Sequence, residues 1–393
     1  MIRRPSLLGA GASRPFAIDV VWRSRYQEGE RVAARLAQHF THRDYQDIVG
    51  GVGLPVVFRE TPDVPGGSLF GVNRRGARAA ATVLLLDSGF PGDAGATAEL
   101  ERLDREVAES GPHSLLLPVV MEDGGLPRGF PLQALRWDRW EGDEAAREEH
   151  LVRDLNHTFC QLLLRRLHHI EGGASPAPGR VRVFLSHSKH DRDGAHIAVG
   201  LRDWMDQNTA LGTFFDLRDI PPGTAFTATL REEIEVSAFV AVRSDSYSAR
   251  GACRSEVLEA KRRGRPFLVL DCLREGEDRA FPYLGNVRTI RVDPASLTGT
   301  DFARITGVLL REVFLRLLWR CRVADIRPGE NDTLFLAGHP EALSLASLPD
   351  QNDAPRLVHP DPSLPAEEAE VLRAIVPGLQ LLTFAEWQEQ GRP

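Results

Sequence analysis

A segment rich in imidazoles and carboxylates, HSKHDRDGAH, begins at residue 187 and offers side chains that metal ions prefer. It contains His187, His190, Asp191, Asp193 and His196. The imidazole spacing does not give the i, i+4 pair that HExxH zinc sites place on one helix face, and no cysteine lies nearby. We therefore interpret the segment as a solvated loop and predict no metal site.

Other catalytic signatures are missing from the sequence. No GxGxxG follows the first expected strand, and neither a GxxxxGKS phosphate loop nor a GxSxG elbow occurs, so kinase, classical dehydrogenase and serine hydrolase functions lack support. The cysteines are isolated in sequence, which indicates neither a disulfide framework nor a zinc site and fits a reducing cytoplasm. They are Cys160, Cys253, Cys272 and Cys321.

Three segments share an order and spacing that are more specific than any one of them. They are FLSHSKHD from residue 184, FFDLRDIPPGTAF from residue 214 and YSARGACRSEVLEAK from residue 247. Together they resemble the TIR (Toll/interleukin-1 receptor) domain family, in particular its bacterial NAD-cleaving type. The resemblance covers roughly a third of the chain.

The resemblance implies that Glu256 is the catalytic residue, because NAD-cleaving members place a glutamate ahead of a helix after the central strand. It also implies substrate-binding residues on the flanking elements, namely Ser186, Asp216, Gly223, Phe226 and Tyr247. Many active members have tryptophan four positions before the glutamate, where this chain has Ala252. An aromatic wall for nicotinamide or ribose then has to come from elsewhere, with Tyr247 or Phe226 as candidates.

One carboxylate is sufficient for cleavage of the bond between nicotinamide and ribose. Ordinary glycoside hydrolysis uses two carboxyl groups because the leaving oxygen must be protonated. In NAD+ the nicotinamide group is a cationic pyridinium, and it departs as a neutral molecule that needs no proton. The enzyme therefore has only to stabilise an oxocarbenium-like ribose. A carboxylate ~4 Å from that charge contributes on the order of 4 kcal/mol at an effective dielectric near 20, which is roughly a thousandfold in rate.

Each of these residues also has a structural interpretation. Glu256 could be a solvated acid in the first turn of a helix, where it favours the helix dipole. The Pro-Pro-Gly loop around Gly223 could be a stiff turn from strand to helix, and the resemblance adds that it closes over the site or docks on a neighbouring subunit. Asp216 and Asp219 are interpreted as acids that order this loop, and Ser186 as lining the site from the end of the first strand.

The surrounding pattern alternates strand-like and helix-like runs and predicts an α/β fold. Before residue 171 we expect strands at 16–22, 54–58, 81–86 and 114–120, with helices at 28–40, 98–109 and 148–167. After it we expect strands at VRVFLS, GTFFDL, SAFVAVRS, PFLVLDCL and VRTIRV, with helices near 196–207, 226–236, 252–263 and 301–320. A short β-α-β-α-β unit follows and is expected to pack on the second unit or on a partner.

The chain is thus predicted to hold tandem flavodoxin-like, parallel-sheet (TIR-like) domains and a small C-terminal α/β unit. The expected divisions are a flexible tail at 1–15, a degenerate TIR-like domain at 16–170, a linker at 171–180, a TIR domain at 181–322 and the C-terminal unit at 323–393. The closing sections of the two halves look alike, which indicates a divergent duplication.

The first half carries an acid, Glu99, within a position of the place equivalent to Glu256, but no counterpart of the Pro-Pro-Gly loop or of HSKHD. Its Trp22, Phe58 and Leu84 are interpreted as core residues rather than cofactor contacts. We interpret this half as an inactive relative that senses, docks or oligomerises.

Composition limits location and partners. With 42% hydrophobic and 26% charged residues in 393, the chain should fold into several domains. Its net charge of -7 and interspersed charges argue against nucleic acid. The N-terminal apolar run is shorter than a signal-peptide core and no segment approaches ~20 apolar residues, so we expect no membrane span and a cytoplasmic protein.

The functional hypothesis is an NAD+ glycohydrolase that takes NAD+ as substrate and has no resident cofactor. By resemblance, it is held inactive until it assembles as a homo-oligomer through TIR contacts, with a protein or small-molecule activator possible, and acts in antiviral defence. Two alternatives stay open: a non-catalytic TIR docking module, and a cyclase that makes a cyclic ADP-ribose messenger.

Overall fold

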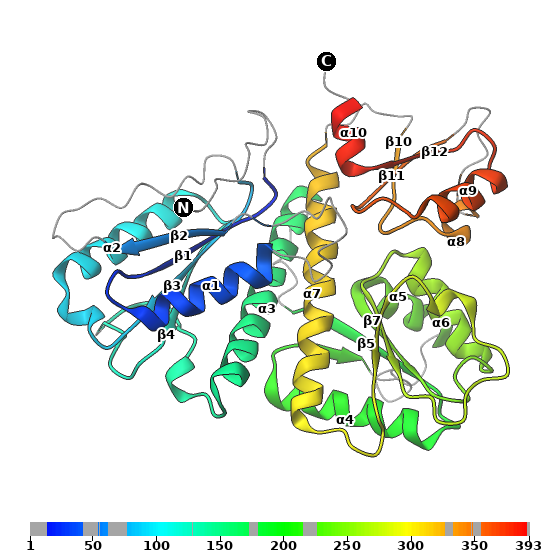
Figure 1. The fold of residues 1–393 in the computed structure, drawn as a ribbon, viewed down its shortest axis with the longest axis horizontal. Coiled ribbons are helices and arrows are strands. Elements are labelled where there is room, and N and C mark those ends of the chain that lie inside the picture. The colour runs from blue at the N-terminus through cyan, green and yellow to red at the C-terminus, as the bar shows by residue number, and fades with distance from the viewer. Residues whose placement is uncertain are drawn as a thin grey trace. The chain divides into compact units, whose positions relative to one another are not determined.

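The structure is a computed structural model. It describes residues 14–41, 54, 56–61, 77–127, 129–172, 180–214, 226–326, 333–346, 348 and 355–390. The chain forms two compact units, the first ending at Glu171 and the second running from Gly172 onward, while the helical stretch Asn156–Gln161 groups with the second. The first unit is built on one parallel sheet, and the second unit holds two, of which the smaller lies in its C-terminal part (Figure 1).

The first unit alternates strands and helices as its sequence pattern predicts. Its elements are β1 Ala17–Arg23, α1 Gln27–Thr41, β2 Val56–Thr61, β3 Ala80–Leu86, η2 Phe90–Gly92, α2 Ala94–Glu109, β4 Ser114–Val120, η3 Trp137–Arg139 and α3 Glu144–Ile170. The strands pair in parallel in the order β2-β1-β3-β4. All seven residues of β3 are buried, as expected for a parallel strand covered on both faces.

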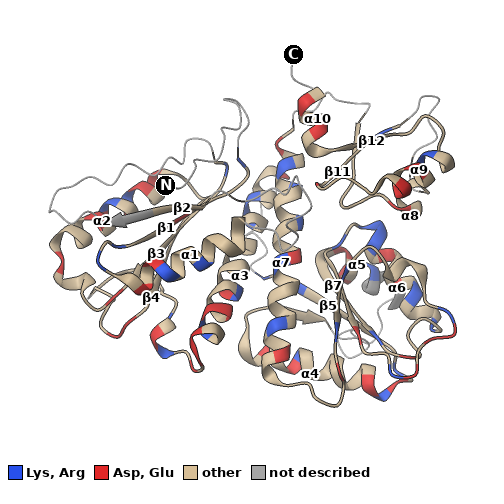
Figure 2. Cartoon of the chain, in the orientation of Figure 1, with Lys and Arg blue, Asp and Glu red and all other residues tan. Residues whose placement is uncertain are grey.

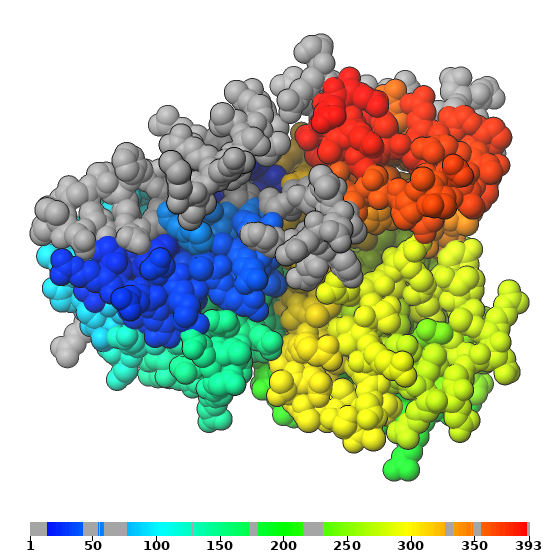
Figure 3. Space-filling view, in the orientation of Figure 1, coloured from blue at the N-terminus to red at the C-terminus, as the bar shows by residue number. Residues whose placement is uncertain are grey.

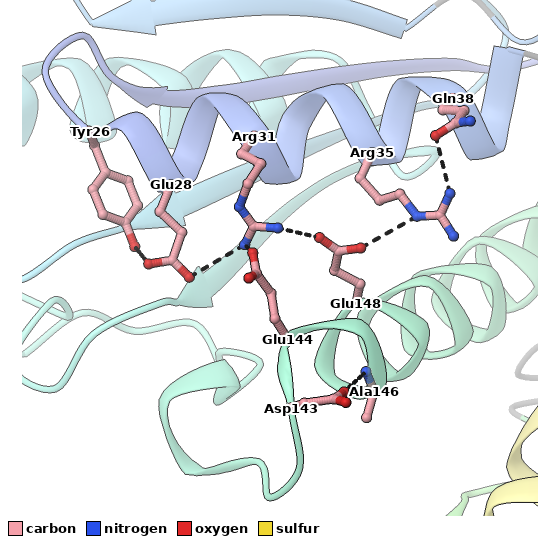
Figure 4. A network of polar contacts seen from close by, with 9 residues as sticks. All are labelled: Tyr26, Glu28, Arg31, Arg35, Gln38, Asp143, Glu144, Ala146 and Glu148. Atoms are coloured by element: carbon pink, nitrogen blue, oxygen red, sulfur yellow. Dashed lines mark hydrogen bonds and ion pairs between the residues drawn. The ribbon is translucent and has the colours of Figure 1, made fainter.

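Ion pairs connect helices α1 and α3 on the surface of the first unit (Figure 4). Arg31 pairs with Glu144 and Glu148, and Arg35 reaches Glu148 at 3.4 Å. Because the arginines are exposed, these pairs orient the helices more than they stabilise the fold.

The second unit continues the same alternation. Its first elements are β5 Arg182–His187, α4 Arg192–Asn208, β6 Gly212–Phe214, α5 Phe226–Val236, β7 Ser237–Arg243, α6 Gly251–Arg262, β8 Phe267–Asp271, η5 Pro282–Leu284, β9 Arg288–Arg291 and α7 Gly299–Ala324. The sheet order is β6-β5-β7-β8-β9, all parallel, which is the flavodoxin-like order. The predicted α/β fold class is confirmed.

The C-terminal unit is a three-stranded parallel sheet with short helices. It comprises β10 Thr333–Phe335, α8 Ala342–Leu345, β11 Arg356–His359, α9 Ala366–Ile375, β12 Gln380–Thr383 and α10 Phe384–Gln390. It packs on α7, where the Trp319 indole donates to the Leu336 carbonyl at 2.8 Å and the ring meets Phe384 edge-on. In Figure 3 the orange and red C-terminal residues lie beside yellow residues of the same unit.

Three helices begin earlier than their apolar spacing predicts, because an aspartate caps each one. Asp93, Asp143 and Asp191 accept backbone N–H groups at the starts of α2, α3 and α4. As a result, the segment predicted as a solvated loop is helical from Arg192 onward.

One of the core residues predicted for the first unit is not buried. Trp22 and Leu84 are buried, but the Phe58 side chain is 46% exposed. The reason is its place on β2, which ends the described strand order and therefore lacks the cover that a central strand receives.

Candidate functional site

Three predicted site residues meet at the carboxyl edge of the second sheet. Ser186 is the penultimate residue of β5, Tyr247 lies in the loop after the neighbouring strand β7, and Glu256 lies in the second turn of α6. Ligands of open parallel sheets bind outside the carboxyl ends of the strands, where the chain crosses between the two faces. The topology thus brings together residues up to 70 positions apart in sequence.

A chain of hydrogen bonds connects these side chains. The Tyr247 hydroxyl lies 2.7 Å from Ser186 Oγ, and Ser186 Oγ donates to Glu256 Oε2 at 2.5 Å. A serine hydroxyl has one hydrogen, so donation to the carboxylate leaves its oxygen to accept from tyrosine. The direction is therefore Tyr247 to Ser186 to Glu256, and it ends on a negative charge.

Burial differs along this chain. Ser186 and Tyr247 are 2% and 0% exposed, whereas Glu256 is partly exposed. Burial, followed by the nearby Cys253 and Glu256, raises the Tyr247 pKa well above its ordinary value, although the Ser186 hydrogen bond opposes the shift. Tyr247 consequently stays a neutral donor. The carboxylate is fixed from inside the protein while its residue still reaches the surface.

The sequence of α6 explains this placement. Cys253, Val257 and Ala260 recur at helical spacing and face the core. Glu256 precedes Val257 and so lies on the flank of that apolar stripe, beside the sheet edge. Its position in the second turn also weakens the interpretation as a first-turn acid that favours the helix dipole, since that effect is confined to the first turn.

Tyr247 does not provide the predicted aromatic wall. Its ring is fully buried in the core cluster with Phe184, Cys253 and Val257, so a ligand cannot stack on it in this conformation. Only its hydroxyl acts at the site. Ala252 is exposed and also offers no ring.

The remaining predicted residues lie at or beyond the described part of this unit. Asp216, Asp219 and Gly223 are outside the described residues, as is the Pro-Pro-Gly loop that contains Gly223. Phe226 is the first residue of α5, and its side chain is likewise outside the description. Their roles remain predictions.

Glu277 supports the loop that carries Tyr247, and sequence reasoning missed it. Its side chain is 4% exposed and accepts from Arg243 Nη2 at 2.7 Å and from the Ser248 backbone N–H at 3.3 Å. Glu277 lies in the polar stretch REGEDR, which looks like an ordinary solvated loop. Its one detectable signal is the position after β8, at the carboxyl edge of the sheet.

The carboxylates of the HSKHD region have structural partners. Asp191 accepts from the Asp193 and Gly194 N–H groups as the N-cap of α4. Asp193 pairs with Arg274 at 2.6 Å. Both acids therefore order the loop and helix start next to Ser186.

The first unit repeats the backbone framework of this site. Phe90 N donates to the Asp87 carbonyl at 3.0 Å, as Tyr247 N does to Ser244 at 2.9 Å. The N-cap residue of the following α-helix then donates its backbone N–H to the carbonyl of the aromatic residue. This bond is 3.2 Å from Asp93 to Phe90 in the first unit and 3.1 Å from Arg250 to Tyr247 in the second. This correspondence makes Glu99 the counterpart of Glu256 and Phe90 the counterpart of Tyr247.

The side chains at the repeated positions do not reproduce the hydrogen-bond chain. Strand pairing places Val21 where the second unit has Ser186, so both hydroxyls are missing. The Glu99 carboxylate is instead bound by Arg102, whose Nε donates at 2.8 Å. The framework is shared, but the first unit keeps only the acid.

Together, the doubly wound sheet and the hydroxyl-supported carboxylate give the second unit a candidate ligand site at the carboxyl edge of its sheet. Residues 183–305 match the family model of the TIR domain, and the second unit therefore contains a TIR domain. The sheet of the first unit is consistent with a preceding, degenerate TIR-like unit. No curated protein matches the chain.

Charge and hydropathy add two observations. Basic and acidic residues are interspersed along both units (Figure 2). No helix in the described part of the chain is long and apolar enough to cross a membrane.

Proposed function

We propose that this protein is an NAD+ glycohydrolase whose Glu256 carboxylate stabilises the ribosyl cation as nicotinamide leaves. The observation that supports this proposal is the hydrogen-bond chain from buried Tyr247 through Ser186 to the partly exposed carboxylate. A charge-assisted bond at 2.5 Å is among the strong hydrogen bonds of proteins. It orients the acid before the substrate arrives.

The reaction breaks the bond between the ribose C1′ and the pyridinium nitrogen. The bonding electrons leave with nicotinamide, which becomes neutral, and the positive charge passes to the ribose. Glu256 faces this developing charge, and no second acid is needed. Water then adds to C1′ and loses a proton, which gives ADP-ribose.

Cyclisation differs in one step only. An internal nucleophile of the ADP-ribosyl group, instead of water, captures the same cation and yields a cyclic ADP-ribose. Glu256 has the same role in both reactions, so chromatography of the products distinguishes a hydrolase from a cyclase.

Activity depends on assembly in this proposal. The protein is a cytoplasmic homo-oligomer formed through TIR contacts, and a protein or small-molecule activator triggers NAD+ depletion in antiviral defence. These properties are proposed from the resemblance to TIR proteins, and the match over residues 183–305 supports a TIR-family role in general.

The alternative function is a non-catalytic TIR docking module. It is favoured by the exposed Ala252 and the buried Tyr247 ring, because neither presents an aromatic surface to nicotinamide. In this alternative the Ser186–Glu256 bond serves only to attach α6 to β5.

Nicotinamide release from NAD+ tests the choice. The full chain, concentrated or with a crowding agent, is compared with Glu256→Ala and with Glu259→Gln, a change on the same helix in an acid that Arg263 already pairs. We expect wild type and Glu259→Gln to release nicotinamide and Glu256→Ala to be inert. If wild type and Glu256→Ala both fail to release nicotinamide under every assembling condition, the glycohydrolase proposal is wrong and the docking module is the remaining function.

A further inference from the structure

An arginine that has no partner among the described residues lies where the C-terminal unit meets the TIR domain. Arg316, on α7, has its Nη1 buried, and the described residues give its guanidinium neither a hydrogen bond nor an ion pair. Glu312, one turn earlier, attracts Arg316 electrostatically but makes no ion pair with it in the described structure. A buried guanidinium nitrogen without an acceptor is costly, and a ligand with acceptor oxygens would remove that cost.

Two segments approach Arg316 on α7. A Cβ added to Gly338, in the C-terminal unit, would lie 3.2 Å from Nη2 and 3.6 Å from Nη1. One added to Gly264, after α6, would lie 3.9 Å from Nη1 and would collide with Ala337. Two glycine positions thus lie near the guanidinium. The residue as a whole is partly exposed.

Two further cations lie within electrostatic reach of Arg316. Arg265 uses only its Nε in the described structure, donating to the Ser237 carbonyl at 2.9 Å. Lys261 Nζ lies 3.1 Å from Glu341 Oε1 and donates to the Gly285 carbonyl at 2.9 Å. Burial, with repulsion from neighbouring arginines, lowers the pKa of Arg265 to about 10, and burial lowers that of Arg316 to about 10 as well. Arg265 is thus buried close enough to Arg316 and Arg320 for their positive charges to repel it.

We infer that this junction of α6, α7 and the Gly338 loop binds the phosphate group of a small-molecule ligand. Arg316 is the main ligand contact, with Arg265 and Lys261 contributing charge. Guanidinium forks match phosphate oxygens in geometry, and a phosphate monoester carries a charge of about -1.5 to -2 at neutral pH. A neutral ligand would leave the buried charge uncompensated.

Thermal unfolding of the full chain with inorganic phosphate, against sodium chloride at matched ionic strength, tests this inference. Wild type should unfold at a higher temperature in phosphate than in chloride. Arg316→Gln should lose that response, yet be at least as stable as wild type in chloride because it removes an unpaired buried charge. The control Arg263→Gln changes an exposed arginine paired with Glu235 and Glu259, and should respond like wild type.

Calorimetric titration with inorganic phosphate measures the same site directly. We expect Arg316→Gln to bind at least about tenfold more weakly than wild type, as for loss of a charged hydrogen bond. Glu256→Gln should bind phosphate as wild type does, whether or not the protein cleaves NAD+. Equal binding by wild type and Arg316→Gln, no phosphate-specific shift in wild type, or loss of binding in Glu256→Gln would each overturn the inference.

Discussion

Ser186 donates its hydroxyl hydrogen to Glu256 across 2.5 Å, and this bond joins the first strand of the TIR sheet to the helix that carries the acid. Ser186 is itself held by the Tyr247 hydroxyl at 2.7 Å. The orientation of Glu256 thus depends on two buried hydroxyls that are missing at the matching positions of the first unit.

Replacement of Ser186 by alanine should lower kcat while the fold is kept. The carboxylate loses the donor that orients it, and hydrogen bonds to charged groups contribute about 1.5–3 kcal/mol, which corresponds to roughly a tenfold to hundredfold decrease. Initial rates of nicotinamide release, with circular dichroism to check folding, measure this. An unchanged kcat would show that the bond has no catalytic role.

Tyr247→Phe should act through Ser186. The phenyl ring keeps the core packing, and only the outer donor is lost, so kcat should fall by about tenfold at most. The double variant Ser186→Ala/Tyr247→Phe should be no slower than Ser186→Ala alone, because the tyrosine has no separate path to the acid. Additive losses in this cycle would contradict the proposed order of the chain.

Alkaline pH should reveal the buried Tyr247. Its folded pKa lies well above the ordinary value of 10.0, chiefly because burial disfavours the phenolate. The unfolded chain therefore releases this proton first, and stability falls as pH rises above the unfolded value toward the folded one. Chemical denaturation at pH 8 to 11 should show that the free energy of unfolding falls more steeply with pH for wild type than for Tyr247→Phe. Equal slopes for the two proteins would contradict a raised pKa of Tyr247.

Glu99→Gln should leave NAD+ cleavage unchanged, although Glu99 matches Glu256 in position. Its carboxylate is bound by Arg102, and no hydroxyl chain reaches it from Phe90 or Val21. Product formation by Glu99→Gln, measured beside Glu256→Gln, tests whether the first unit lacks catalysis. A comparable loss in both variants would assign a catalytic acid to each unit.

Glu277→Gln should destabilise the protein by about 1–3 kcal/mol, since it weakens a buried acceptor of Arg243 and of the Ser248 N–H. The loop that carries Tyr247 loses its support, so activity should fall as well. Urea denaturation measures the first effect, and nicotinamide release measures the second. If both stay at wild-type values, Glu277 is not the support described above.

Much of the fold follows from the sequence because parallel strands are short, continuous apolar runs. AATVLLL and SAFVAVR are recognisable from composition, and their β-α alternation leaves few topologies. Helix starts were less predictable. Asp93, Asp143 and Asp191 begin their helices before any apolar residue recurs, so spacing alone places the start too late.

The site was predictable only in part. Ser186 and Glu256 follow from the motif order, and the sheet edge brings them into contact. Burial of the Tyr247 ring depends on packing from several elements, which a linear pattern does not encode. In the sequence, nothing distinguishes Glu277 from the solvated acids beside it. Its burial results from the fold of the loop, which brings it against Arg243.

The most direct measurement is the ratio of kcat for NAD+ cleavage between wild type and Glu256→Gln, both assembled at the same concentration. Glutamine keeps the size of the side chain and can still accept from Ser186, but it has no charge. Stabilisation of a ribosyl cation by one carboxylate predicts a ratio of about a thousand. A ratio near one, with wild type active, would contradict catalysis by the Glu256 charge.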